Sequence, residues 1–174
     1  MDSCVTYKQI RNDKEIITYV EKSDEALKSI GYTEHSFAHV EKVATNASWL
    51  LEKLGYSEHE CDLAKIAGLM HDIGNIINRI DHAQSGAMVA FRLLDHMDMP
   101  AEDISTIVSA IGNHDESTAQ PINPISAALI IADKCDVRRS RVRNTELIKF
   151  DIHDRVNYAV EKAELILSDD KKSL

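Results

Sequence analysis

The sequence predicts an all-α protein, a compact single-domain bundle of about six to eight helices. Apolar residues recur at helical spacing along almost the whole chain, and the alternation typical of β-strands is almost absent. Capping residues and glycines mark where successive helices begin and end. A chain of 174 residues suits one domain with its own buried core. We therefore predict a single domain over residues 1–174, with a motif-bearing core in residues 32–142 and flanking N- and C-terminal helices.

The first three helices are expected in the N-terminal half of the chain. One begins near Asn12 or Asp13; Leu27 and Ile30 continue it or form a second short helix, and Gly31 closes this stretch. A second is closed by Gly55 in the C′ position and carries the apolar stripe Phe37, Val40, Val43, Ala44, Ala47, Leu50, Leu51 and Leu54. A third begins where Ser57 and Glu60 have the spacing of a capping box, and it ends within residues 71–74.

The C-terminal half predicts four more helices. Residues 83–97 form one that stops before Pro100, and residues 101–111 form another that is followed by Gly112. Asn123 and Pro124 are a capping residue and an N1 proline, and they start a helix over 124–137. A last helix is expected near 154–167 from the spacing of Val156, Ala159, Val160, Ala163 and Leu167. At most a short extended piece is expected near 143–150.

Charge and composition exclude several function classes. The net charge of −9 argues against binding of nucleic acid polymers or anionic membranes, which need a positive field. The widely spaced Cys4, Cys61 and Cys135 do not resemble a disulfide scaffold or a zinc finger. The N-terminus lacks the features of a signal peptide, and the longest apolar run, "ISAALIIA", is too short to span a bilayer. We therefore expect a cytoplasmic protein, and its apolar terminal helices are compatible with a homodimer.

Histidines and aspartates fall at helix ends or share a helix face. The candidates are His35 and His39, the adjacent His71 and Asp72, then His82, His114 and Asp133. Asp133 interrupts an otherwise apolar helix, where a carboxylate is costly unless it is paired or bound to a cation. The apolar segment "IAGLM" places His71 and Asp72 at the end of a helix, and Gly74 lets the chain turn away.

Imidazole nitrogens and carboxylate oxygens suit a divalent metal, one or two ions of Fe, Mn, Co, Ni, Zn or Mg. No cysteine belongs to the pattern, so a closed structural zinc site is not expected. A mixed histidine and aspartate shell leaves positions open for water, as in a catalytic site. Because aspartate can bridge two cations, His71 can ligate one ion while Asp72 reaches a second.

The order His39, then His71-Asp72, then Asp133 resembles the H…HD…D motif of the HD superfamily of metal-dependent phosphohydrolases. The flanking segments "HVEKVA", "AGLMHDIG" and "IADKCD" resemble the family too, and the match covers residues 32–142. The resemblance implies an all-helical fold. It also implies that these four residues bind a first metal.

The pattern is closest to small bacterial and archaeal single-domain members with extra histidines. His82 and His114 resemble the additional ligands of binuclear members, which include the HD-GYP group and small bacterial dinucleoside-polyphosphate hydrolases. The resemblance implies that they hold a second metal, with Asp72 as the bridge. His35 resembles the first histidine in the "YHNxxH" spacing of cyclic-nucleotide phosphodiesterases, which protonates the leaving group, although this chain reads "TEHSFAH".

Two departures from the family pattern concern the substrate. Many relatives carry a lysine where this chain has Asn75, so that role is vacant or passes to Arg79. The GYP element is absent, which argues against a cyclic-di-GMP phosphodiesterase. Basic residues after the last ligand suit phosphate oxygens, with a salt-bridged helix or dimer contact as the alternative; they are Lys134, Arg138, Arg139 and Arg141.

The leading hypothesis is a metal-dependent phosphohydrolase that cleaves a phosphate ester or anhydride, of a nucleotide or a related small phosphorylated metabolite. The expected catalytic residues are His35 as proton donor, Asp72 at the metals and Arg79 in the role of the missing lysine. One alternative is a di-iron oxygenase of the same fold. Another is a non-catalytic, nucleotide-binding regulatory module.

Overall fold

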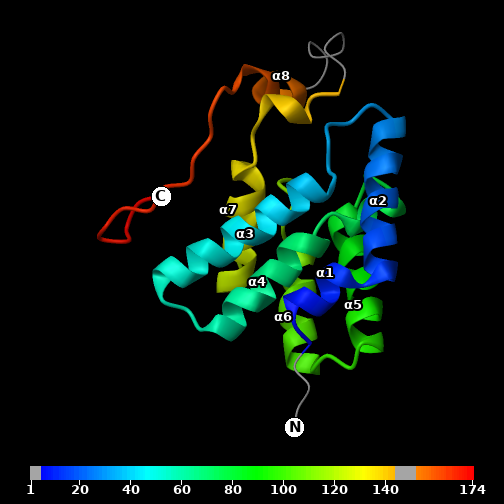
Figure 1. Cartoon of the computed structure of the whole chain (residues 1–174), viewed down its shortest axis with the longest axis vertical. Coiled ribbons are helices and arrows are strands. Elements are labelled where there is room, and N and C mark those ends of the chain that lie inside the picture. The colour runs from blue at the N-terminus through cyan, green and yellow to red at the C-terminus, as the bar shows by residue number, and fades with distance from the viewer. Residues whose placement is uncertain (1–4, 144–151) are drawn as a thin grey trace.

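The computed structural model describes residues 5–143 and 152–174, and within them every regular element is a helix (Figure 1). The α-helices are α1 (Tyr7–Asn12), α2 (Lys14–Ser29), α3 (Phe37–Leu54), α4 (Glu58–Met70), α5 (His82–His96), α6 (Ala101–Gly112), α7 (Pro124–Cys135) and α8 (Ile152–Ala159). Two 3₁₀ helices connect them, η1 (Ile73–Ile76) and η2 (Arg139–Arg141). The predicted all-α fold is confirmed.

The hairpin of α3 and α4 forms the centre of the bundle. Gly55 ends α3 in the left-handed conformation with φ 95°, and Ser57 with Glu60 forms the predicted capping box of α4. Helix α3 packs on α4 and α7, while α4 also packs on α6, and α5 pairs with α6. These helices bury apolar residues completely where they meet, including Val43, Ile66, Leu69, Ile107 and Leu129.

Two glycines allow backbones to approach closely beside the metal-ligand candidates. A Cβ on Gly74 would lie 2.0 Å from the backbone oxygen of His82, so only glycine lets η1 contact the start of α5. A Cβ on Gly68 would lie 2.6 Å from the Cα of Ala44, where α4 crosses α3. Gly74 was expected to let the chain turn away, but its structural role is this close packing. These contacts fix the spacing of the segments that carry His71 and His82.

Most helix boundaries follow the sequence signals. Asp13 caps α2 by accepting hydrogen bonds from the Glu15 and Ile16 amides, and Asn123 caps α7 with proline at its start. Helix α1 was not predicted. It begins with a capping box of Thr6 and Gln9 and is too short for a visible apolar period.

The prediction of a last helix over 154–167 was wrong. Helix α8 ends at Ala159, and the chain continues without regular structure to residue 174. The residues that α8 buries are Asp154 and Asn157, so Val156 and Ala159 of the predicted apolar stripe are not buried in a core. A helical pattern without a packing partner is marginal in water. The extended piece expected near 143–150 lies almost wholly outside the described residues.

Beyond α8 the chain runs back past α7 and α3 (Figure 1). Leu167 packs against the core there, although the segment is irregular. None of the helices in the described residues is long and apolar enough to cross a membrane.

Candidate metal centre

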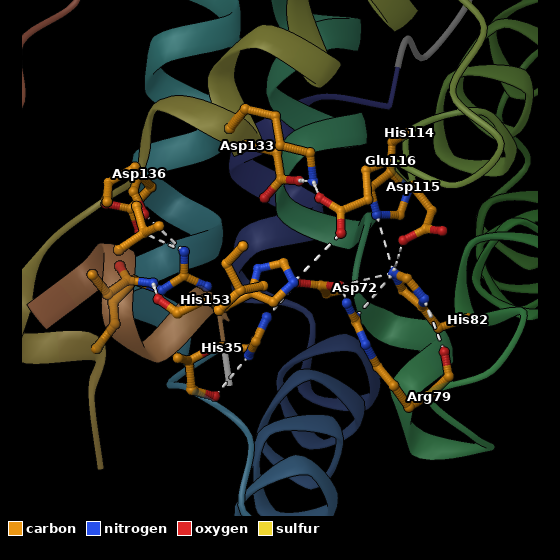
Figure 2. A pocket seen from close by; sticks show the side chains of 17 residues that line it. His35, Asp72, Arg79, His82, His114, Asp115, Glu116, Asp133, Asp136 and His153 are labelled. Carbon is orange, nitrogen blue, oxygen red and sulfur yellow. Dashed lines mark hydrogen bonds and ion pairs between the residues drawn. The ribbon is translucent and has the colours of Figure 1, made fainter. Parts of the chain in front are cut away.

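Side chains from five helical segments converge on one buried point. His39 lies in the first turns of α3, His71 and Asp72 follow α4, and His82 opens α5. His114 follows α6, and Asp133 lies in the last turn of α7. Figure 2 shows Asp72, His82, His114 and Asp133 directed toward one another from these separate segments. The imidazoles are almost fully buried, at 0–4% exposure.

The first set of donor atoms comes from His39, His71, Asp72 and Asp133. The Nε2 atoms of His39 and His71 are 3.3 Å apart. Asp72 Oδ2 lies 3.0 Å from His71 Nε2 and 3.5 Å from His39 Nε2. Asp133 Oδ1 lies 3.4 Å from His39 Nε2 and 3.7 Å from His71 Nε2. All four predicted first-metal residues are therefore brought together.

The second set of donor atoms consists of Asp72 Oδ1 and the Nε2 atoms of His82 and His114. Asp72 Oδ1 lies 3.5 Å from His82 Nε2, which in turn lies 3.3 Å from His114 Nε2. Asp72, His82 and His114 form one group able to hold an ion, and His71, His114 and Asp133 form another that connects the two sets. Because the two oxygens of Asp72 face different histidines, this carboxylate has the geometry of a bridge.

Hydrogen bonds orient every imidazole with Nε2 toward the cluster. The Nδ1 atoms of His71, His82 and His114 donate to the backbone oxygens of Gly68, Arg79 and Ile111, at 2.8, 3.1 and 2.7 Å. A carbonyl oxygen only accepts, so these bonds fix the proton on Nδ1. The lone pair of the neutral ring is then on Nε2, where a metal ligand needs it.

The donor set fits a divalent metal. Ligands held about 2.1 Å from one ion lie roughly 3.0–3.5 Å from each other in octahedral or tetrahedral geometry. The distances of 3.0–3.7 Å within the first set match that spacing. Nitrogen and carboxylate donors without cysteine suit Mn, Fe, Co, Ni or Zn. The carboxylates would also repel a phosphate unless cations neutralised them.

The electrostatics of the ligands agree with this chemistry. Burial alone would lower the pKa of His39, but its contacts with Asp133, Asp136 and Asp72 raise it to about 10. Burial lowers the pKa of His114 to about 4 and also lowers that of His82, so both rings are neutral near pH 7. Burial opposes ionisation of Asp72, but the neighbouring histidines hold its pKa well below the usual range.

Asp136 is a functional candidate that the sequence analysis missed. Its Oδ2 accepts a hydrogen bond from His39 Nδ1 at 2.8 Å, which directs His39 Nε2 toward the metal position. The side chain is fully buried and also contacts Lys42 and Arg138, at 3.2 and 2.9 Å. The segment "DKCD" does place Asp136 one helical turn after Asp133. Its contact with His39 was not visible in the sequence, because the two residues are 97 positions apart.

The cluster lies at one side of a pocket of about 370 Å³ (Figure 2). Of the predicted catalytic and phosphate-binding residues, His35, Asp72, Arg79, Lys134 and Arg141 line it. The pocket is also lined by residues that the sequence analysis did not assign to the site, including Asp115, Glu116, Ile152, His153 and Val156. Asp115 is half-buried at the pocket wall, whereas Glu116 and His153 are exposed there.

His35 faces Asp72 with its Nε2 atom, 4.0 Å from Asp72 Oδ2. Its Nδ1 donates to the backbone oxygen of Thr33 at 2.8 Å. Burial lowers the pKa of His35 to about 3, so the ring presents a lone pair to the pocket near neutral pH. Its predicted proton transfer therefore requires that the ring first take a proton, which an anionic substrate beside it would favour.

Arg79 and Asn75 form a short chain of contacts to the bridging carboxylate. Asn75 is buried, and its Nδ2 donates to both the backbone oxygen and Oδ1 of Asp72, each at 2.9 Å. Arg79 Nη1 lies 3.5 Å from Asn75 Oδ1, 3.2 Å from His82 Nε2 and 3.9 Å from Asp72 Oδ1. A guanidinium therefore stands beside the position where many relatives carry lysine.

The structure places Arg138 and Arg139 differently from the other predicted phosphate contacts. Arg138 pairs with Asp136 and with Glu34, at 2.9 and 3.1 Å. Arg139 donates to the backbone oxygen of Tyr158 at 2.7 Å and stacks over its ring. Neither side chain lines the pocket, because both are committed to contacts that hold neighbouring segments. The ion pairs of Arg138 fit the salt-bridged alternative. Lys134, Arg141 and Arg79 are the predicted cationic residues that line the pocket.

Comparison with known proteins places these features in a family context. The family model described as the HD domain matches residues 36–138, which lie within the predicted motif core of 32–142. An uncharacterized protein of Methanocaldococcus jannaschii is 24% identical over 188 residues, a match that spans 95% of this chain and 72% of the relative.

A crystal structure of similar fold is described as a predicted HD superfamily hydrolase from an uncultured Thermotogales bacterium. It matches with a TM-score of 0.55 and 25% sequence identity, over 71% of this chain and 67% of that chain.

Proposed function

This chain belongs to the HD domain family, and on that premise we propose that it is a metal-dependent phosphohydrolase. Its substrate would be a phosphate ester or anhydride, of a nucleotide or a related small phosphorylated metabolite. One observation carries the proposal: the two oxygens of Asp72 face different histidine sets beside a pocket that also holds cationic side chains. The solved structure of similar fold, which is described as a predicted hydrolase, supports the same reaction class.

Divalent ions at these ligands would supply a water nucleophile at neutral pH and stabilise charge on the phosphoryl oxygens. Side chains of the protein would bind the substrate and supply the proton for the leaving group. Lys134, Arg79 and Arg141 line the pocket and would bind the non-reacting phosphate oxygens. Two carboxylates hold Lys134 in place: its Nζ lies 3.0 Å from Asp133 Oδ2 and 3.5 Å from Glu116 Oε2.

His35 is the proposed proton donor to the leaving group. Its side chain is only 10% exposed in the wall of the pocket, and the backbone oxygen of Thr33 fixes its orientation through Nδ1. An approaching phosphate would favour the protonated ring, which then has an N–H on Nε2 to give up. Asp72 Oδ2, 4.0 Å from His35 Nε2, would stabilise that cation.

Phosphate release tests the proposal directly. Metal-depleted protein would be loaded in turn with Mn²⁺, Fe²⁺, Co²⁺, Ni²⁺, Zn²⁺ and Mg²⁺, and incubated with nucleotides and small phosphate esters. Metal-dependent release from at least one compound is expected. No release from any compound, with bound metal verified by elemental analysis, would overturn the proposal.

The same assay separates the alternatives. Phosphate release by a hydrolase persists without oxygen, whereas turnover by a di-iron oxygenase stops. Asp72→Ala should abolish release, whereas a pure binding module would show no turnover even in the unaltered chain.

A further inference from the structure

The pocket beside the metal ligands has two chemically different sides. One side carries the ligand cluster with Lys134, Arg79 and Arg141, which suits a phosphate. The other side is the face of α8, where Ile152 and Val156 line the same pocket. A substrate that consisted only of phosphate groups would gain nothing from this second side.

Ile152 and Val156 are four residues apart, so both side chains project from one face of α8. They line the pocket yet remain 61% and 49% exposed, so they are not used to fill the core. Apolar side chains that stay open to water inside a cleft gain free energy when an apolar ligand surface covers them. Among the described residues, this pair forms a wall that the protein leaves open to water and that a ligand would cover.

Contacts with the segment around η2 hold α8 in this position. Asn157 is buried, and its Oδ1 accepts a hydrogen bond from the Arg138 amide at 3.0 Å. Arg139 donates to the backbone oxygen of Tyr158 at 2.7 Å. Because η2 follows the ligand helix α7 closely along the chain, the wall is tied to the segment that carries Asp133.

Polar groups mark the edge between the two sides. His153 Nε2 lies 3.4 Å from Glu116 Oε1, and the other oxygen of Glu116 lies 3.5 Å from Lys134 Nζ. Figure 2 shows His153 and Glu116 among the residues that surround the pocket. These groups place polar atoms at the border of the apolar wall, where the heteroatoms of a planar ring would meet them.

We propose that the face of α8 formed by Ile152, His153 and Val156 is a subsite for the organic group of the substrate. The group it fits has a flat apolar face and polar ring edges, as a nucleobase has. The cavity of about 370 Å³ lies near the lower end of the size range for small-molecule sites, which suits a mononucleotide. The assignment rests on the proposed function, in that the phosphate is placed at the metals.

Equilibrium binding tests the subsite without depending on turnover. The probes are a hydrolysis-resistant phosphonate analogue of adenosine monophosphate and the matching ribose phosphonate, which lacks the base. Calorimetry with the Mn²⁺-loaded full chain should show that the adenosine analogue binds at least about tenfold more tightly. The double variant Ile152→Ser, Val156→Ser should remove most of that difference and leave the affinity for the ribose analogue within about twofold.

Two further variants make the result specific. Val156→Thr keeps the shape of the side chain and replaces a methyl with a hydroxyl, so a smaller loss confined to the adenosine analogue is expected. Ile30→Ser is the matched control, because Ile30 is also 61% exposed but lies outside the pocket. It should change neither affinity.

Equal affinity for the two analogues in the unaltered chain would overturn the subsite, as would equal weakening of both by the double variant. Sedimentation can also contradict the subsite. If the unaltered chain is a dimer and only the double variant is a monomer, a second copy of the chain covers this face of α8. Failure of the proposed function appears separately, as absence of phosphate release, and leaves the binding ratio measurable.

Discussion

Asp136 Oδ2 accepts a hydrogen bond from His39 Nδ1 at 2.8 Å, on the side of the ring opposite the ligand cluster. This contact fixes the ring and its tautomer, so Asp136 is a positioning residue rather than a ligand. Asp136→Asn should lower the affinity for the first metal by about 10–100-fold, because the amide is a weaker acceptor and the ring loses its orientation. Competition with a chromogenic chelator measures the change.

The chain provides a matched control for that variant. His59 Nε2 and Asp103 Oδ1 form another pair at 2.8 Å, outside the pocket lining. Asp103→Asn should leave metal affinity unchanged. If both variants weaken metal binding alike, the effect of Asp136 is on general stability and its positioning role is refuted.

His35→Ala should lower kcat for an alkyl phosphate by about 10²–10⁴-fold, the usual contribution of general acid catalysis. The loss should be much smaller for p-nitrophenyl phosphate, because its leaving group departs without a proton. Metal content, measured by elemental analysis, should not change. An equal loss for both substrates would show that His35 acts on the metals or on folding instead.

Metal affinity should rise with pH, because a proton competes for His39. The pKa of His39 is raised to about 10, so in the metal-free chain this ring is protonated at pH 7 and must release its proton to bind an ion. The affinity for the first metal should gain about tenfold for each pH unit between pH 6.5 and 8.5 from this residue alone. His114, with a pKa of about 4, is already neutral in that range.

Calorimetry in buffers of different ionisation enthalpy would count the released protons. About one proton is expected for the first metal at pH 7. An affinity that is constant over this range, with no proton released, contradicts the prediction.

Asn75 and Arg79 should affect different kinds of binding: Arg79 that of the substrate and Asn75 that of the second metal. Arg79→Ala should raise KM for a phosphate ester by about 10–100-fold with metal content unchanged, since it removes a charged hydrogen bond to substrate. Asn75→Ala should weaken the second metal by about tenfold, because Asp72 Oδ1 loses the donor that orients it. Asn78→Ala is the control, since Asn78 lies outside the pocket lining. A loss of metal in Arg79→Ala would contradict this division.

The sequence was most informative where spacing is local. The stripe of α3, the capping box of α4 and the adjacent His71 and Asp72 depend on neighbours within one or two turns, so the pattern predicts both element and site. Asp133 was recognisable because a carboxylate in an apolar helix needs a partner. His82 and His114 followed from the family resemblance, and the structure places both beside Asp72.

What the sequence did not predict depends on contacts between distant segments. Arg139 looked like a phosphate ligand beside other basic residues, but α8 folds back and uses it as an anchor. Only the packing of α8 places the exposed side chain of His153 at the pocket wall. The end of α8 at Ala159 likewise depends on where a packing surface stops, which periodicity does not record.

We propose that Asp72 joins two metal ions in a site that hydrolyses phosphate compounds. Titration of metal-depleted protein, with bound metal and phosphate release measured at each addition, tests this role most directly. We expect phosphate release to rise to a plateau at two ions per chain, and we expect Asp72→Ala to bind neither ion tightly and to release no phosphate. A chain that holds two ions without releasing phosphate from any nucleotide or phosphate ester, or one in which Asp72→Ala keeps both ions, would contradict it.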